Sequence, residues 1–252
     1  MLTPSRGGPA AVGTWIKSSA VESVEIMAQV GFDFIVIDME HTMLGLAEVY
    51  RHIITATSCG LPPLVRVPDH ASATIQRVLD AGARGVLVPH VDTADQARAA
   101  AAATRFPPHG TRGAGNTSRA GRWGQLGRAE YLRYGNAETL CIPQLESRTA
   151  ITNAAAILGT PGIDAALVGP ADLALDADLP AGSADFSQLT EYALHAARDA
   201  GKPLGTVTGS SPPAAQDSYR RGYSFVIMSN DLTMLAEAAA SLMERFRQPE
   251  QG

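Results

Sequence analysis

Eight short apolar runs alternate along the chain with eight amphipathic, helix-type patterns, and this alternation constrains the fold more than any other feature. A strand covered on both faces has a short unbroken apolar run, and strands separated by helical patterns pair in parallel through crossover helices. Eight such units within 252 residues predict an α/β fold, a closed (β/α)8 TIM barrel forming a single domain over residues 1–252, rather than an open sheet. The expected strands are 11–17, 32–38, 61–67, 85–91, 140–146, 164–169, 203–208 and 224–229.

Glycines mark the expected ends of several helices. A glycine accepts the left-handed backbone that stops a helix, and the predicted helices include Val21–Val30 and Ala94–Thr104. The glycines placed between a helical pattern and the next apolar run are Gly31, Gly60, Gly82, Gly201 and Gly222.

The longest stretch without a clear element is Phe106–Asn136, which carries five arginines and the aromatic residues Trp123, Tyr131 and Tyr134 among glycines. A long loop in a compact domain is usually functional. This one fits either a lid or subunit contact that raises the positive potential for an anionic substrate, or a plain solvated loop. Asp176–Ser187 is also expected to be a loop, and Arg247–Gly252 a frayed tail.

The composition argues against several classes of protein. A net charge of -5 and a pI near 5.7 are unlike a protein that binds nucleic acid or an anionic membrane surface. The two cysteines, Cys59 and Cys141, do not suggest a disulfide framework and fit a reducing cytoplasm. We expect neither a signal peptide nor a membrane span, because no apolar window has the required length.

Two acidic residues follow consecutive apolar runs. The run Ala165–Val168 stops at a Gly-Pro pair that leads to Asp172, and Glu146 closes the run Leu140–Leu145. The carboxyl ends of barrel strands meet at one rim, so the two carboxylates can face one centre. Oxygen ligands of this kind suit Mg²⁺ or Mn²⁺. The alternative is two unrelated surface acids.

Other polar residues also fall at the predicted strand ends. Gln144 lies two residues before Glu146, so its side chain points to the same side of the strand. It could bind a water molecule coordinated to the metal ion, or the ligand itself. Arg66 is the one guanidinium at a strand end, so we expect it to contact the oxygen of a 2-oxo acid and to stabilise an enolate. The remaining rim residues are Asp38, Glu40, His41, Pro89, His90, Thr206, Thr208, Ser229, Asn230 and Asp231.

His41 and Asp80 are candidates for proton transfer. An imidazole titrates near neutral pH, so His41 can act as a general acid or base; alternatively it is bonded to the backbone where a helix begins. Asp80 lies near the end of the third predicted helix, where the helix dipole disfavours an acid. It could orient a histidine, or pair with Arg77 or Arg84.

Lysine content bears on how the chain could make an enolate. The two lysines are Lys17 and Lys202, and Lys202 precedes the seventh predicted strand, on the opposite face of the barrel. Lys17 is therefore the one amine that could form a Schiff base. A metal-assisted route is better supported, and no phosphate-binding or dinucleotide motif is found.

Several motifs follow one another along nearly the whole chain: GTW at 13–15, GFDFIVIDMEH at 31–41, VRVP at 65–68, LDAGARGVLVPHV at 79–91, RFPPHGTRGAG at 105–115, QLES at 144–147 and GPADL at 169–173. Together they resemble the HpcH/HpaI aldolase family. Members of that family are metal-dependent class II aldolases that cleave 4-hydroxy-2-oxo acids to pyruvate and an aldehyde, and their fold is the (β/α)8 barrel.

The resemblance implies roles for individual residues. It implies that Glu146 and Asp172 bind a divalent metal ion (Mg²⁺ or Mn²⁺, with Co²⁺ or Zn²⁺ possible) and that Arg66 contacts the keto oxygen of pyruvate. His41 and Asp80 would form the acid/base dyad. The backbone amides of Ala171 and Asp172 would receive the pyruvate carboxylate, as helix N-termini commonly do.

The resemblance also implies partners and alternatives. Family members are typically homohexamers, trimers of dimers, that exchange the last helix, which would give Leu232–Phe246 a role in assembly. After GPADL the chain departs from the usual family pattern and continues with 174–179, ALDADL. Macrophomate synthases and siderophore citrate synthases share the scaffold but use oxaloacetate, so an oxaloacetate-using enzyme is the alternative, followed by a non-catalytic barrel that binds a small acid.

Overall fold

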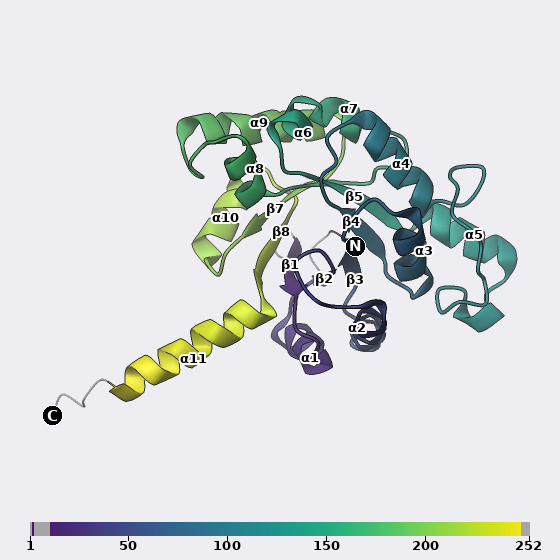
Figure 1. The fold of residues 1–252 in the computed structure, drawn as a ribbon, viewed down its shortest axis with the longest axis horizontal. Coiled ribbons are helices and arrows are strands. Elements are labelled where there is room, and N and C mark those ends of the chain that lie inside the picture. Colours follow the sequence, from purple (N-terminus) through teal and green to yellow (C-terminus); the bar gives the residue numbers. More distant parts are fainter. Residues whose placement is uncertain (1, 3–10, 248–252) are drawn as a thin grey trace.

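The described residues, 2 and 11–247 of the computed structural model, form a closed barrel of eight parallel strands in the order β1 to β8 (Figure 1). Each strand lies within its expected segment or ends one residue beyond it, so the predicted barrel is confirmed. The strands are β1 Ala11–Ile16, β2 Phe34–Asp38, β3 Pro63–Arg66, β4 Gly85–Val88, β5 Leu140–Leu145, β6 Ala166–Val168, β7 Leu204–Thr208 and β8 Phe225–Asn230.

Helices surround the barrel and connect its strands (Figure 1). The helices α1 and α4 have the predicted bounds, and all five predicted glycines have left-handed backbone angles, such as φ 99° at Gly31. The helices are α1 Val21–Val30, α2 Leu46–Ser58, α3 Ser72–Asp80, α4 Ala94–Thr104, α5 Arg128–Ala137, α6 Arg148–Thr152, α7 Ala154–Leu158, α8 Pro170–Asp176, α9 Ala184–Asp199, α10 Pro212–Arg221 and α11 Asp231–Arg247, with a 3-10 turn, η1, at Arg122–Gly124.

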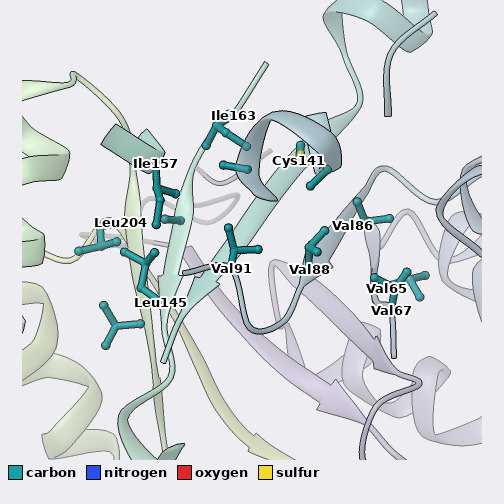
Figure 2. Packing of buried hydrophobic residues seen from close by; sticks show 14 of the residues in the cluster. Val65, Val67, Val86, Val88, Val91, Cys141, Leu145, Ile157, Ile163 and Leu204 are labelled. Carbon is teal, nitrogen blue, oxygen red and sulfur yellow. The ribbon is translucent and has the colours of Figure 1, made fainter. Parts of the chain in front are cut away.

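Successive strand residues feed two apolar layers. In β2, Phe34 and Val36 belong to the cluster inside the barrel, whereas Ile35 and Ile37 belong to the larger cluster between strands and helices. Figure 2 shows part of that outer cluster, including Val86 and Val88 of β4. The alternation follows from the two-residue period of a strand. The two packed layers hold the strands in place, and with them the residues at the carboxyl ends of the strands.

The long segment 106–136 is not a featureless loop, and the prediction was wrong on this point. It contains η1 and most of α5. Tyr131 of α5 packs against Phe106 with ring centroids 5.0 Å apart, and a Cβ on Gly135 would lie 2.3 Å from the Phe106 ring. A contact across 25 residues of sequence thus stabilises a helix whose own pattern is weakly apolar.

The second expected loop, 176–187, is shorter than predicted. Residue Asp176 still belongs to α8, and α9 begins at Ala184 behind Ser183, whose side chain accepts a hydrogen bond from the Phe186 N–H. An N-cap serine of this kind is a local signal for a helix start. The intervening loop therefore covers 177–183.

The last helix, α11, projects away from the barrel (Figure 1). Its first residue, Asp231, is buried and accepts hydrogen bonds from the backbone N–H groups of Lys17 and Ser18. Arg247 ends α11, and the rest of the predicted tail, 248–252, lies outside the described residues. Within the described chain, no helix combines the length and apolar character that crossing a membrane requires.

Candidate active site

A cavity of about 460 Å³ opens at the carboxyl ends of the strands. This is the rim where barrels of this type hold their reacting groups. The predicted residues that line it come from β3, from β5 and from the segments after β2 and β6: Arg66, Gln144, His41, Ala171 and Asp172. The structure therefore brings five of the seven predicted site residues to one cavity, and Glu146 contacts one of them.

The Arg66 side chain is fixed by contacts with three neighbouring residues of this site. Its Nε and Nη2 donate to the two carboxylate oxygens of Asp38 at 2.9 and 2.8 Å, and its guanidinium lies 4.2 Å from the centroid of the Trp15 ring. Its Nη1 lies 2.9 Å from Glu40 Oε2. The paired bonds and the stacking fix the plane of the guanidinium, as a bidentate carboxylate partner does.

Asp38 is fully buried and carries its charge because of its partners. Burial alone would raise its pKa, but the Arg66 guanidinium, the Lys17 ammonium and the His41 backbone N–H outweigh burial, so the pKa of Asp38 lies below its usual 3.8. Lys17 Nζ lies 3.2 Å from Asp38 Oδ2. The one rim lysine is thus engaged in an ion pair.

Glu40, His90 and Glu146 form a compact group of potential metal ligands, with one ligand atom of each within 4.8 Å of the others. His90 Nδ1 lies 3.1 Å from Glu146 Oε1, and His90 Nε2 lies 3.2 Å from Glu40 Oε1. The His90 backbone is left-handed, with φ 52°, and its N–H donates to Glu146 Oε1 at 2.6 Å. Two carboxylates and an imidazole therefore converge beside Arg66.

Glu40 is destabilised as an anion. Burial raises its pKa above the usual 4.5, Arg66 lowers it, and the nearby Glu146 charge raises it again, with His41 and His90 acting in the lowering direction. The balance leaves the pKa raised. A further positive charge at this position would stabilise the ionised carboxylate.

Gln144 connects the ligand group to the cavity. Its Nε2 donates to Glu146 Oε2 at 2.8 Å, while its buried Oε1 has no hydrogen-bond partner among the described residues. Gly169 leaves the space that this arrangement needs, since a Cβ there would lie 3.0 Å from Glu146 Oε2. A buried amide oxygen without a partner is costly unless a ligand satisfies it.

Asp172 and Ala171 lie in the first turn of α8, directly after β6, and line the same cavity as Arg66 and Gln144. Asp172 is not a member of the compact ligand group, which instead contains Glu40 and His90 beside Glu146. The predicted metal pair of Glu146 and Asp172 therefore stays a prediction. Its two residues come from neighbouring strand ends.

His41 and Asp80 occupy different surroundings. The His41 side chain is exposed at the cavity, and its Nε2 lies 3.8 Å from Glu40 Oε2. Asp80 ends α3, where its Oδ1 accepts from Arg112 Nη2 at 2.7 Å and from the Tyr131 hydroxyl at 3.3 Å, rather than pairing with Arg77 or Arg84. Within the described part of one chain no contact joins the two, and their dyad stays a prediction.

Sequence reasoning placed Asp38, Glu40 and His90 on the rim without giving them roles. The one signal for these three residues was their position along the chain, since Asp38 ends β2, Glu40 follows β2 and His90 follows β4. The bidentate bond from Arg66 to Asp38 and the bridge made by His90 depend on neighbouring strands coming together. Neither can be read from spacing within one segment.

Comparison with known proteins bears on the same residues. The family model for HpcH/HpaI aldolase/citrate lyase matches residues 11–238. The chain belongs to this family. The match covers every strand and the first part of α11, so all the rim residues lie inside it.

Relatives and solved structures of the HpcH/HpaI family agree with this assignment. The chain is 34% identical to a 2-keto-3-deoxy-L-rhamnonate aldolase of Shigella sonnei strain Ss046, over 98% of this chain and 92% of the relative. An HpcH/HpaI aldolase/citrate lyase family protein from Burkholderia cenocepacia J2315 superposes with a TM-score of 0.89 at 32% identity, covering 96% of this chain and 97% of that one. An HpcH/HpaI aldolase from Desulfitobacterium hafniense DCB-2 gives 0.90 at 27% identity, with 96% and 95% covered.

Proposed function

We propose that this protein is a metal-dependent aldolase that cleaves 4-hydroxy-2-oxo acids to pyruvate and an aldehyde, and joins them in the reverse direction. The Arg66 guanidinium supports this proposal most directly, because it is fixed at the rim beside a group of two carboxylates and one imidazole. The aldolase name of a relative 34% identical over nearly the whole chain supports the reaction class.

Arg66 is the proposed stabiliser of the substrate's 2-oxo group. In retro-aldol cleavage the bond between C3 and C4 breaks, and its electron pair moves to give an enolate with negative charge on the C2 oxygen. A guanidinium held by Asp38 and stacked on Trp15 does not need to reorganise as that charge develops. The backbone N–H groups of Ala171 and Asp172, in the first turn of α8, are the proposed hydrogen-bond donors to the substrate carboxylate.

His41 is the proposed base. Its side chain is exposed at the cavity, so it can take the proton of the 4-hydroxyl group directly or through water. Loss of that proton lets the aldehyde carbonyl form as the C3–C4 bond breaks. A proton then returns to C3 of the enolate and gives pyruvate. The predicted role of Asp80 is to support His41.

The rim residues fit a divalent cation. Glu40, His90 and Glu146 offer oxygen and nitrogen ligands close together, and burial together with the nearby Glu146 charge raises the pKa of Glu40. The partnerless Gln144 Oε1 adds a further acceptor beside Glu146. A bound cation would polarise the 2-oxo group of the substrate. The mixed ligand set suits Mn²⁺, Co²⁺ or Zn²⁺ as well as Mg²⁺.

Direct Mn²⁺ binding, measured by calorimetry, tests this site without relying on turnover. Glu146→Gln should abolish binding, because Glu146 belongs both to the predicted pair and to the compact group. His90→Asn and Asp172→Asn identify the second ligand, since losing a true ligand should weaken binding by at least about tenfold. Asp178→Asn, an exposed acid near α8, is the matched control. Wild-type affinity in Glu146→Gln would refute the metal site.

Product analysis tests the reaction. We expect pyruvate release from a panel of 4-hydroxy-2-oxo acids, dependent on added Mn²⁺ and lost after chelation. Oxaloacetate is assayed in parallel because enzymes that share the scaffold use it. If the enzyme consumes oxaloacetate alone, the oxaloacetate-using alternative is supported in place of the aldolase. If it consumes neither substrate, the result supports a non-catalytic barrel that binds a small acid.

We also propose that the chain assembles with copies of itself through α11, in the hexamer that the family resemblance implies. Beyond Met234 every residue of α11 is exposed, including Leu235 at 67%, Leu242 at 60% and Phe246 at 82%. An apolar face of this length is a common mark of a protein interface.

We further propose a cytoplasmic location. Cys59 and Cys141 are free thiols, and this supports the proposal because thiols stay reduced in the cytoplasm.

A further inference from the structure

A second cavity, of about 890 Å³, lies at the opposite end of the barrel from the active-site rim. It is bounded by the amino ends of β3 and β4 and by the segment 119–138. Arg84 fixes this location, because its N–H donates to Pro63 O at 2.8 Å and its carbonyl accepts from Leu140 N–H at 3.0 Å, directly before β4 and β5. The volume is within the usual range for a small-molecule site.

The charge in this cavity is predominantly positive. Four arginines line it against two glutamates, and Arg133 Nη1 pairs with Glu138 Oε1 at 2.8 Å. The other three, Arg84, Arg119 and Arg122, form no ion pair with a carboxylate anywhere in the described chain. A chain with net charge -5 thus carries a local concentration of unneutralised guanidinium groups. Guanidinium groups are well suited to phosphate oxygens.

Two of these guanidiniums are positioned by their neighbours. Arg84 lies 5.5 Å from the centroid of the Tyr134 ring, and its Nη1 donates to the Tyr134 hydroxyl at 3.4 Å. Arg119 packs directly over Gly82, where an added Cβ would lie 2.8 Å from Arg119 Nη1. Held side chains lose less conformational freedom on binding a ligand than free surface arginines do.

An aromatic ring lines the cavity from a strained turn. The Trp123 side chain is 64% exposed, and both Arg122 and Trp123 have left-handed backbones, with φ of 51° and 57°. The Trp123 N–H donates to Ser118 O at 3.0 Å, which holds the turn in place. Bulky residues rarely adopt this conformation, and such strain concentrates at ligand sites. An exposed indole also offers a flat surface for stacking.

We propose that this cavity, named here the arginine cavity after Arg84, Arg119 and Arg122, binds a nucleoside diphosphate. The phosphates would contact the three guanidiniums, and the base would stack on Trp123. The combination of unpaired guanidiniums with an exposed ring is what distinguishes this ligand from a simple inorganic anion. The proposal is independent of the aldolase reaction, because none of the predicted catalytic residues lines the cavity.

Calorimetry with ADP and the full-length protein tests the proposal. EDTA is present throughout, so that no cation can hold the phosphates at the active-site rim. We expect saturable binding that weakens by about tenfold or more in Arg119→Gln and in Arg122→Gln, because each loses a charge-assisted bond. Arg128→Gln is the matched control, an exposed arginine of the same segment outside the cavity, and should bind ADP like wild type.

Further arms of the experiment separate the ring from the phosphates. Trp123→Gly removes the indole at a position whose backbone suits glycine, so the variant should fold, as far-UV circular dichroism checks, and should bind ADP more weakly. Pyrophosphate and adenosine should each bind more weakly than ADP. The proposal is overturned if ADP does not bind, if pyrophosphate binds as tightly as ADP, if pyruvate competes with ADP, or if neither arginine variant changes the affinity.

Discussion

Arg66 illustrates how much one side chain at this rim depends on its neighbours. Asp38 binds two of its nitrogens, Trp15 covers its face, and Glu40 lies 2.9 Å from the third nitrogen. The sequence predicted that a guanidinium stands at a strand end, but the three partners come from β1, β2 and the segment after β2. The same holds for Glu146, which forms a ligand group with Glu40 and His90 that differs from the predicted pair.

Replacing Arg66 by lysine tests whether geometry or charge matters there. Arg66→Lys keeps the positive charge but loses the fork that binds Asp38, so we expect kcat/KM for pyruvate release to fall by about 100-fold. Arg98→Lys, at an exposed position on α4, should leave kcat/KM unchanged. An Arg66→Lys variant with nearly wild-type kcat/KM would show that any cation suffices at the 2-oxo group.

At the scale of elements, the junction between β6 and α8 brings the site together. β6 is only three residues long, and Gly169 then caps α8 while leaving space for the Glu146 side chain. The Gly-Pro pair was visible in the sequence as the end of a strand. Its steric role was not, because the carboxylate that fills the space belongs to Glu146, directly after β5 and more than 20 residues earlier.

Gly169→Ala should therefore act through Glu146. The added methyl group would meet the carboxylate at 3.0 Å and Glu146 Cβ at 3.1 Å, so we expect weaker Mn²⁺ binding and about tenfold lower kcat/KM. Gly127→Ala, directly before α5 and outside the cavity, is the control because a Cβ there meets nothing within 4 Å. Equal effects of the two substitutions would contradict the steric explanation.

At the scale of the whole molecule, α11 is the element that a single chain leaves unpacked. Figure 1 shows it extending from the barrel, and its first residue is anchored to the segment after β1 while the rest lies exposed. A helix in a protein is normally stabilised by packing its apolar face against other parts of the structure. The exposed apolar residues of α11 therefore form the surface through which we propose that copies of the chain assemble.

Leu235→Asp tests this assembly. A charge on the apolar face should favour smaller species, measured by size-exclusion chromatography with light scattering, because burying an unpaired carboxylate in an interface is unfavourable. Glu244→Gln, an exposed change on the same helix, should leave the mass unchanged. If wild-type protein is already monomeric, or if Leu235→Asp keeps the wild-type mass, α11 is not the interface.

Local patterns in the sequence were enough to predict the barrel, the ends of its strands and most of the residues at its rim. Apolar runs, helical patterns and glycine stops are local signals, and each expected strand agrees with the structure to within a few residues. Tertiary structure decided the rest: the helix α5 within an expected loop, the pairing of Asp80 with Arg112, and the meeting of Glu40, His90 and Glu146. These features depend on side-chain contacts between segments far apart in the chain, where distance and burial set the energy and spacing along the sequence carries no signal.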